Sequence, residues 1–189
     1  MKKLFVLLLT FCSVCLLQAQ KVKGDLSPLK GVAKVNVEFS YDGVTYDGDS
    51  EAEFFADNKD HDNFEQWKKD WKSRFRKEKW EANFLAKVNE EVGDLKVVFG
   101  TYPKADYTMK VKMVDIDPGS FAGPFSAPCK LTGEIRFVSK GSSDDFATMS
   151  FKKAQGNPYK MTPVIEDRVR FAFEDLGSNV GRVLKKKLE

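Results

Sequence analysis

The chain is poor in the two side chains that build most metal and redox sites. Its 189 residues include three cysteines and one histidine, His61. Zinc sites normally need three or four nitrogen or sulfur ligands, which this set supplies badly. Cys12 and Cys15 lie within the first 20 residues. If that segment is removed, only Cys129 remains and no disulfide can form within the chain. We therefore predict no metal site and no cofactor.

Sequence motifs of catalysis are also missing. The chain has no Gly-x-Ser-x-Gly elbow, no phosphate-binding loop and no dinucleotide fingerprint. Acidic and basic residues nearly balance, with 31 Lys and Arg against 28 Asp and Glu, a net charge of +3. A nucleic-acid footprint normally shows a clear basic excess. We predict no catalytic residues and no nucleic-acid binding, and we favour a protein that is not an enzyme.

Long apolar runs are absent after the first 20 residues. Leu4 to Leu17 is apolar, follows two lysines, and is too short to cross a bilayer comfortably. Ala19 is a small residue suited to a cleavage site. The pattern predicts a signal peptide over residues 1–20, cut next to Ala19 and Gln20. A lipoprotein signal is the alternative, but neither cysteine of this segment follows the small residue that lipidation requires.

Removal of the signal peptide defines the expected mature protein. It takes away two lysines and no acids, which leaves 29 basic and 28 acidic residues and a net charge of +1. Residues 21–189 are long enough for one domain with a substantial core. We expect this domain to be periplasmic or secreted, with no transmembrane segment.

Residues 64–92 carry all three tryptophans on what the spacing predicts to be one long helix. Apolar residues recur every three or four positions, except for one step of five from Phe75 to Trp80. In an α-helix that step turns the apolar stripe by roughly 100°. We expect Asp62 and Glu65 to cap the start and Gly93 to form a left-handed turn at the end. The stripe consists of Phe64, Trp67, Trp71, Phe75, Trp80, Phe84, Val88 and Val92.

Five segments alternate apolar and polar residues as half-buried strands do. A bulge is expected near Met113, where the apolar positions shift by one. Residues 20–30 read as a loose lead-in. Residues 42–63 predict either a short edge hairpin or an irregular acidic connector. The predicted strands cover residues 34–41, 95–99, 107–116, 131–137 and 147–151.

A second helix is predicted from Thr162 and Pro163, a good cap and first position, to Leu188. Gly177 and Gly181 lie near its apolar stripe and predict a close approach to a neighbouring element. Together these elements predict an α+β fold: a mainly antiparallel four- to five-stranded sheet with two helices packed on one face, as a two-layer sandwich.

The chain carries several short motifs: Ala105-Asp106-Tyr107-Thr108, Asp117-Pro118-Gly119, Leu176-Gly177 with Gly181 and Lys185 to Lys187, the Ala19-Gln20 junction, and the spacing of Trp67 and Trp71. With these motifs the chain resembles a family of small secreted proteins of Gram-negative bacteria that has no established activity. The resemblance implies an exported protein of the cell envelope, and it adds no site residues. At the level of fold, the layout is also similar to the amino-terminal domain of TolB and to the curli-secretion lipoprotein, a likeness that does not transfer function.

Three groups of residues have side chains that could bind a metal ion or act as a nucleophile. His61 lies among aspartates, which suits a solvated loop better than a metal site. Asp47, Asp49 and Glu51 alternate as calcium ligands do, but the loop lacks the required glycine and the final glutamate. Cys129 is the one mature thiol, and a buried apolar role is favoured over a nucleophilic one.

The basic face of the long helix could meet anionic lipid headgroups, although a solvated face is preferred. The segment from Asp117 to Pro128 is longer than a tight turn needs and presents Phe121 and Phe125 between glycines and prolines. Such loops are often contact sites. The equal alternative is that both rings fold back to cap the open edge of the sheet or the core. We take Asp117, Phe121 and Phe125 as the candidate contact loop.

The sequence leaves three functions open. The first is a non-catalytic binding module of the cell envelope, whose partner is another envelope protein or lipid. The second is a carrier of a lipid or small apolar ligand in a pocket lined by Trp67, Trp71 and Met109. The third is a hydrolase that uses scattered carboxylates.

Overall fold

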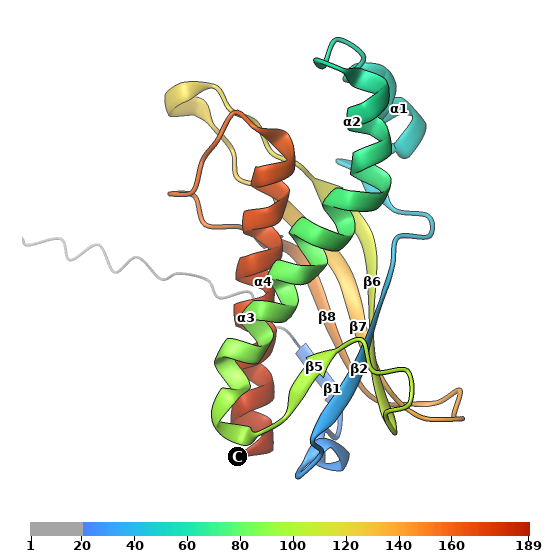
Figure 1. Cartoon of the computed structure of the whole chain (residues 1–189). Helices are drawn as coiled ribbons and strands as arrows, with labels where there is room; N and C mark the ends of the chain where they lie inside the picture. The colour runs from blue at the N-terminus through green and yellow to red at the C-terminus, as the bar shows by residue number, and fades with distance from the viewer. Residues whose placement is uncertain (1–20) are drawn as a thin grey trace, which may run out of the picture.

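The computed structural model describes residues 21–189, and the predicted signal peptide and its cleavage position at Ala19 and Gln20 lie outside the described residues. A twisted sheet forms one layer, and a long bent helix and the last helix cross one face of it (Figure 1). The α+β prediction is confirmed, but the sheet differs in detail from the prediction. In the part of the chain that the structure describes, no helix is long and apolar enough to cross a membrane.

The sheet has eight strands, rather than four or five, in the order β1-β8-β7-β6-β2-β5, with β3 joined to β6 and β4 to β3. Its long ladders, β6 with β7 and β7 with β8, are antiparallel. β2 pairs in parallel with both β5 and β6, so the sheet is mixed. The strands are β1 (Lys21–Gly24), β2 (Lys34–Ser40), β3 (Thr45–Tyr46), β4 (Asp49–Ser50), β5 (Val98–Gly100), β6 (Tyr107–Asp117), β7 (Lys130–Ser139) and β8 (Asp145–Gln155).

The extra strands come from segments with weak periodicity. β1 was predicted as a loose lead-in, yet it pairs with β8 from Lys21 opposite Ser150 to Gly24 opposite Ala147. β3 and β4 are two residues each and form the edge hairpin that was one of two alternatives for residues 42–63. The predicted bulge is confirmed, because the register of β6 on β7 shifts between Met113 and Asp115.

The long helix runs without a break from Phe64 to Val92, as predicted, but its middle is wound differently. α2 (Phe64–Asp70) and α3 (Ala82–Val92) are α-helical, and Trp71–Glu81 between them forms a π-helix, η2. A π-helix bonds each residue to the one five positions away, so it accommodates the five-residue step. The expected turn of the apolar stripe by 100° is therefore wrong, because the rings of Trp71 and Trp80, on either side of that step, contact each other. The stripe residues from Trp67 to Val92 are all buried.

The π winding brings two tryptophans together. In an α-helix, residues nine positions apart point in roughly opposite directions. Here the rings of Trp71 and Trp80 lie 4.9 Å apart, edge to face. Both indole nitrogens find acceptors: Trp71 donates to the Tyr46 hydroxyl at 2.9 Å, and Trp80 donates to the Glu166 carbonyl at 3.1 Å. The two rings thus link the helix both to the β3 hairpin and to the last helix.

The ends of the long helix do not use the predicted caps. Asn63, in a left-handed conformation, precedes the first turn, and no side chain caps it. Gly93 begins a short 3₁₀ turn, η3 (Gly93–Leu95), and Lys96 takes the left-handed conformation instead. An additional helix that was not predicted, α1 (Glu51–Asp57), starts with a capping box of Ser50 and Glu53. Another short 3₁₀ turn, η1 (Ser27–Leu29), follows β1.

The last helix, α4 (Ile165–Leu188), begins two residues after the predicted Pro163. Its predicted close approach is confirmed. A Cβ on Gly177 would lie 2.5 Å from the Phe84 carbonyl oxygen of α3, and one on Gly181 would lie 2.6 Å from the Cβ of Glu91. α3 and α4 therefore touch backbone to backbone across these two glycines.

The face of the sheet away from the helices is polar. Inward residues of β6, such as Met109, Val111 and Met113, are buried, whereas Lys110 and Lys112 between them are exposed. Glu134 and Arg136 stand opposite these lysines on β7. The apolar core thus lies between the sheet and the helices, and the open face is solvated.

We predict that Gly177→Ala destabilises the protein. Alanine is the better helix former by about 1 kcal/mol, but its methyl group has no room against Phe84. Overpacking of this kind lowers the free energy of unfolding by about 1–3 kcal/mol. Urea unfolding would measure the change, with Ser178→Ala on the same helix as the control. Equal stability of both variants would show that the helices do not touch at Gly177.

Candidate functional site

The predicted contact loop connects β6 to β7 and projects beyond the sheet at one end of the molecule (Figure 1). Its tip is a short 3₁₀ turn, η4 (Gly123–Phe125). The Phe121 side chain is 48% exposed and Phe125 is 85% exposed. The alternative in which both rings fold back to cap the sheet edge or the core does not occur, since neither ring is buried.

Hydrogen bonds within the loop fix its backbone. Ser120 and Ala127 exchange two backbone bonds, of 2.9 and 3.1 Å. Inside that bridge, the Ser126 hydroxyl accepts from the Ala122 amide at 3.0 Å and donates to the Gly123 carbonyl at 2.7 Å. Gly119 has φ of +67°, and a Cβ there would collide with the Ala127 carbonyl. The loop is therefore an ordered hairpin that holds Phe125 outward.

Asp117, which we predicted as part of the contact loop, has a role at its base. One carboxylate oxygen accepts from the Gly119 amide at 2.9 Å, and the other pairs with the Lys130 ammonium at 2.8 Å. The Asp117 side chain is largely buried. It shapes the turn and does not face outward with the two phenylalanines.

A second loop, residues 156–164, adjoins the first and was not predicted as part of a site. The Gly156 amide donates to the Cys129 carbonyl at 2.9 Å, which joins the two loops at their bases. Tyr159 is 94% exposed and Val164 is 40% exposed. The Asn157 side chain accepts from the Tyr159 amide at 2.9 Å and fixes this turn. The one sequence signal was the turn pair Asn157-Pro158.

Arg168 of α4 ties the two loops together. Its side chain is buried, with 8% exposure, and has no carboxylate partner among residues 21–189. Its guanidinium donates to the carbonyls of Pro118 at 2.9 Å, Thr162 at 2.9 Å and Pro163 at 3.0 Å. A longer bond of 3.4 Å reaches the Gly119 carbonyl. Burial lowers the pKa of Arg168 from its usual value.

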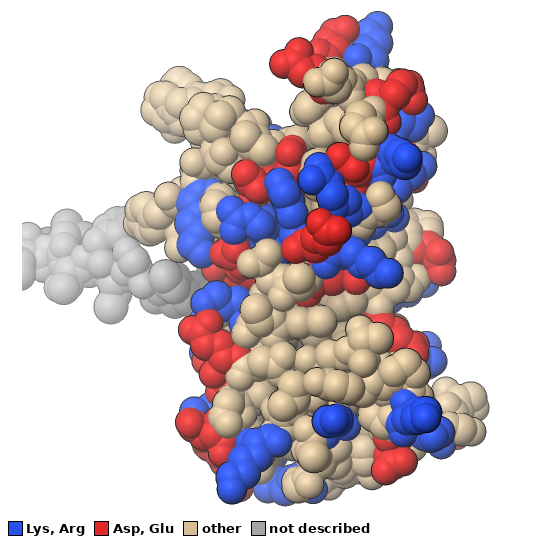
Figure 2. Space-filling view, in the orientation of Figure 1, with Lys and Arg blue, Asp and Glu red and all other residues tan. Residues whose placement is uncertain are grey.

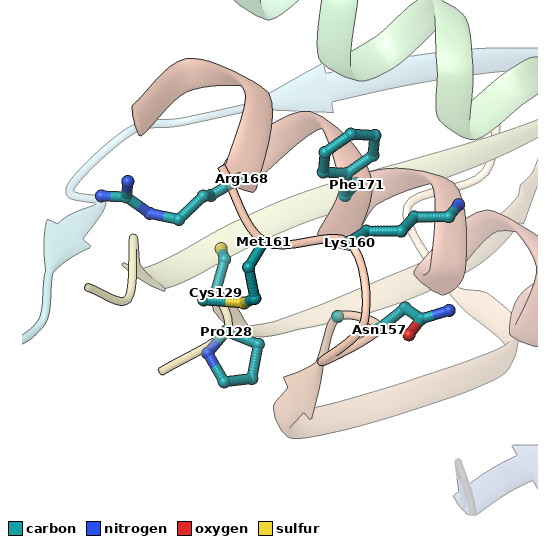
Figure 3. A pocket seen from close by; sticks show the side chains of 8 residues that line it. Pro128, Cys129, Asn157, Lys160, Met161, Arg168 and Phe171 are labelled. Carbon is teal, nitrogen blue, oxygen red and sulfur yellow. The ribbon is translucent and has the colours of Figure 1, made fainter. Parts of the chain in front are cut away.

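A small hollow lies beneath this junction (Figure 3). Its volume of about 10 Å³ is roughly the space of one water molecule. Cys129 lies in its wall, and complete burial raises the pKa of that thiol far above its usual value. The hollow is lined by Pro128, Cys129, Gly156, Asn157, Lys160, Met161, Arg168 and Phe171.

The other candidate residues are dispersed in structural roles. His61 stacks on Trp67, with 4.5 Å between ring centroids. Asp47 has a positive φ in the β3–β4 hairpin, and Glu51 pairs with Lys72 at 2.6 Å and with Arg76 at 2.5 Å. No group of three or more His, Cys, Asp or Glu in residues 21–189 could hold a metal ion.

The residues predicted to line a ligand pocket are packed in the core. Trp67, Trp71 and Met109 are all buried, and the two indole rings lie 5.1 Å apart. The basic face of the long helix is partly paired, since Lys72 and Arg76 meet Glu51 and Lys79 meets Asp167 at 3.3 Å. These pairs join the helix to its neighbours in the fold.

Comparison of the chain with protein-family models, with curated proteins and with solved structures finds no match in any of the three.

We predict that Arg168→Met loosens both loops. It removes the donor for the carbonyls of Pro118, Thr162 and Pro163, and one buried polar group without a partner costs about 1–3 kcal/mol. Chymotrypsin should then cleave after Phe125 and Tyr159 several-fold faster than in the wild type. Arg170→Met is the control, because Arg170 makes part-exposed ion pairs with Asp167 and Glu174. Equal cleavage of the two variants would contradict the role of Arg168.

Proposed function

We propose that the protein is a secreted or periplasmic, non-catalytic module that binds another component of the cell envelope through the loop from Pro118 to Ala127. The observation that carries the proposal is the Phe125 ring, 85% exposed on a loop with a fixed backbone. A phenylalanine gains about 1.5–3 kcal/mol when it is fully buried, so this ring is placed to gain energy from a contact.

The fixed backbone of the loop is a second feature that favours binding. A contact loop that is already folded loses little conformational entropy when it docks, so more of its burial energy appears as affinity. The bridge between Ser120 and Ala127 and the bonds of Ser126 provide this order before any partner arrives. Phe121, 48% exposed in the same loop, adds to the apolar area on offer.

The location comes from the sequence. The apolar run of residues 4–17 after two lysines is typical of an export signal, which would place the domain in or beyond the periplasm. The surroundings of the thiol and of the imidazole support a binding role over catalysis. Cys129 is buried, and His61 stacks on Trp67.

The test measures retention of the purified protein on isolated cell envelopes. The double variant Phe121→Ser with Phe125→Ser should fold with an unchanged melting temperature, because both rings are exposed. Its binding to envelopes should fall at least about ten-fold, because two apolar contacts are lost.

The matched control is Val98→Ser with Val114→Ser, which removes two partly exposed apolar side chains, 42% and 46% exposed, from elsewhere on the surface. This control should bind as the wild type does. Equal retention of both double variants, or loss of cooperative unfolding in the phenylalanine variant, would overturn the proposal.

A further inference from the structure

The two adjoining loops form one surface with four exposed apolar side chains, which we call the paired tip: Phe121 and Phe125 from one loop, and Tyr159 and Val164 from the other. Arg168 and the bond from Gly156 to Cys129 hold the loops side by side. Figure 2 shows the first loop as an uncharged projection at the upper left, above the start of α4. Both loops project from the body of the molecule (Figure 1), and Phe125 and Tyr159 are the most exposed large apolar side chains of residues 21–189.

The paired tip is nearly free of charge in a chain that is 31% charged. No Asp, Glu, Lys or Arg occurs from Pro118 to Cys129, and from Ala154 to Ile165 the one charge is Lys160. Two loops far apart in the sequence thus share the same composition where they meet. Because a charged group loses free energy of hydration when it leaves water, an uncharged projecting surface can enter an apolar environment at lower cost.

Four lysines lie at the base of the paired tip, together with the acidic residues Asp117, Glu174 and Asp175. Lys130 begins β7, directly after the first loop, and Lys160 lies in the second. Lys152 and Lys153 lie near the end of β8, beside the start of β7, where Leu131 stands opposite Ala154. Lys130 and Lys160 pair with Asp117 and Glu174. Lys152 and Lys153 are exposed and make no ion pair within residues 21–189.

We propose that the paired tip docks into the surface of a lipid bilayer that contains anionic headgroups. This inference rests on the proposed function and names the partner of the same site. Apolar rings would enter the boundary of the acyl chains, where aromatic side chains such as Tyr159 are favoured. Lys152 and Lys153 would remain at the depth of the headgroups, where each basic residue gains energy from anionic lipid.

The shape of the surface favours a bilayer over a protein groove. Phe125 and Tyr159 are 85% and 94% exposed, on two projections that rise from one base. A fluid interface accepts two separate projections without a matching cavity for each. Below the uncharged rings, Lys152 and Lys153 remain available to anionic headgroups, because the charges of Lys130 and Lys160 are paired with Asp117 and Glu174.

The test uses the protein purified after export and removal of the predicted signal peptide, because the apolar run of residues 4–17 would itself bind lipid. It is mixed with protein-free vesicles, one set of phosphatidylcholine alone and one with phosphatidylglycerol added. Flotation measures the bound fraction. The wild type should bind the anionic vesicles. Phe125→Ser and Tyr159→Ser should each weaken that binding about ten-fold. Lys152→Gln with Lys153→Gln should also weaken it about ten-fold, and should leave binding to phosphatidylcholine unchanged. The valine control, Val98→Ser with Val114→Ser, should bind as the wild type does.

The outcomes separate this inference from the proposed function. If the wild type is retained on cell envelopes but binds neither kind of vesicle, its partner is a protein. That result would overturn the inference of bilayer docking and leave the proposed binding module standing. If the wild type binds neither cell envelopes nor vesicles, both the bilayer inference and the proposed function are overturned. Vesicle binding that survives the serine variants of Phe125 and Tyr159 uses another surface and also overturns the inference.

Discussion

The edge-to-face contact between Trp71 and Trp80, 4.9 Å apart, is the constraint on which the rest of the structure depends. It requires the helix to be wound so that residues nine positions apart face the same way, which an α-helix does not allow. The π-helix of Trp71–Glu81 meets that requirement. Because π-helical segments are rare in proteins, the burial of two indoles must outweigh the less favourable winding.

From this contact the remaining elements follow in both directions. Tyr46 accepts from Trp71 and brings the β3 hairpin onto the helix, while Phe173 of α4 stacks on Trp80 at 5.8 Å. The glycines at 177 and 181 let α4 lie directly on α3. The first turn of α4 then places Arg168 beneath the carbonyls of Pro118, Thr162 and Pro163. The exposed loops are thus held by the same helix that closes the core.

Spacing alone predicted much of this arrangement. The limits of the long helix, the bulge near Met113 and the close approach at Gly177 depend on local periodicity, which a sequence displays directly. The π winding was visible as the step of five from Phe75 to Trp80, but we interpreted it with α-helical geometry. β1 was missed because its pairing with β8 depends on distant residues. The role of Arg168 was missed for the same reason, since its acceptors Pro118 and Gly119 are backbone carbonyls far away in the sequence. The exposure of Phe125 could not be decided from composition, because buried and exposed aromatic loops have the same residues.

The most direct measurement is a double-mutant cycle on Trp71→Leu and Trp80→Leu, followed by urea unfolding. The cycle isolates the interaction between the two rings from their separate contributions to burial. The π-helical contact predicts a coupling free energy of about 0.5–1.5 kcal/mol, as aromatic pairs give. Effects that add to within about 0.3–0.5 kcal/mol would contradict it, because they would place the two rings apart, as on opposite sides of an α-helix.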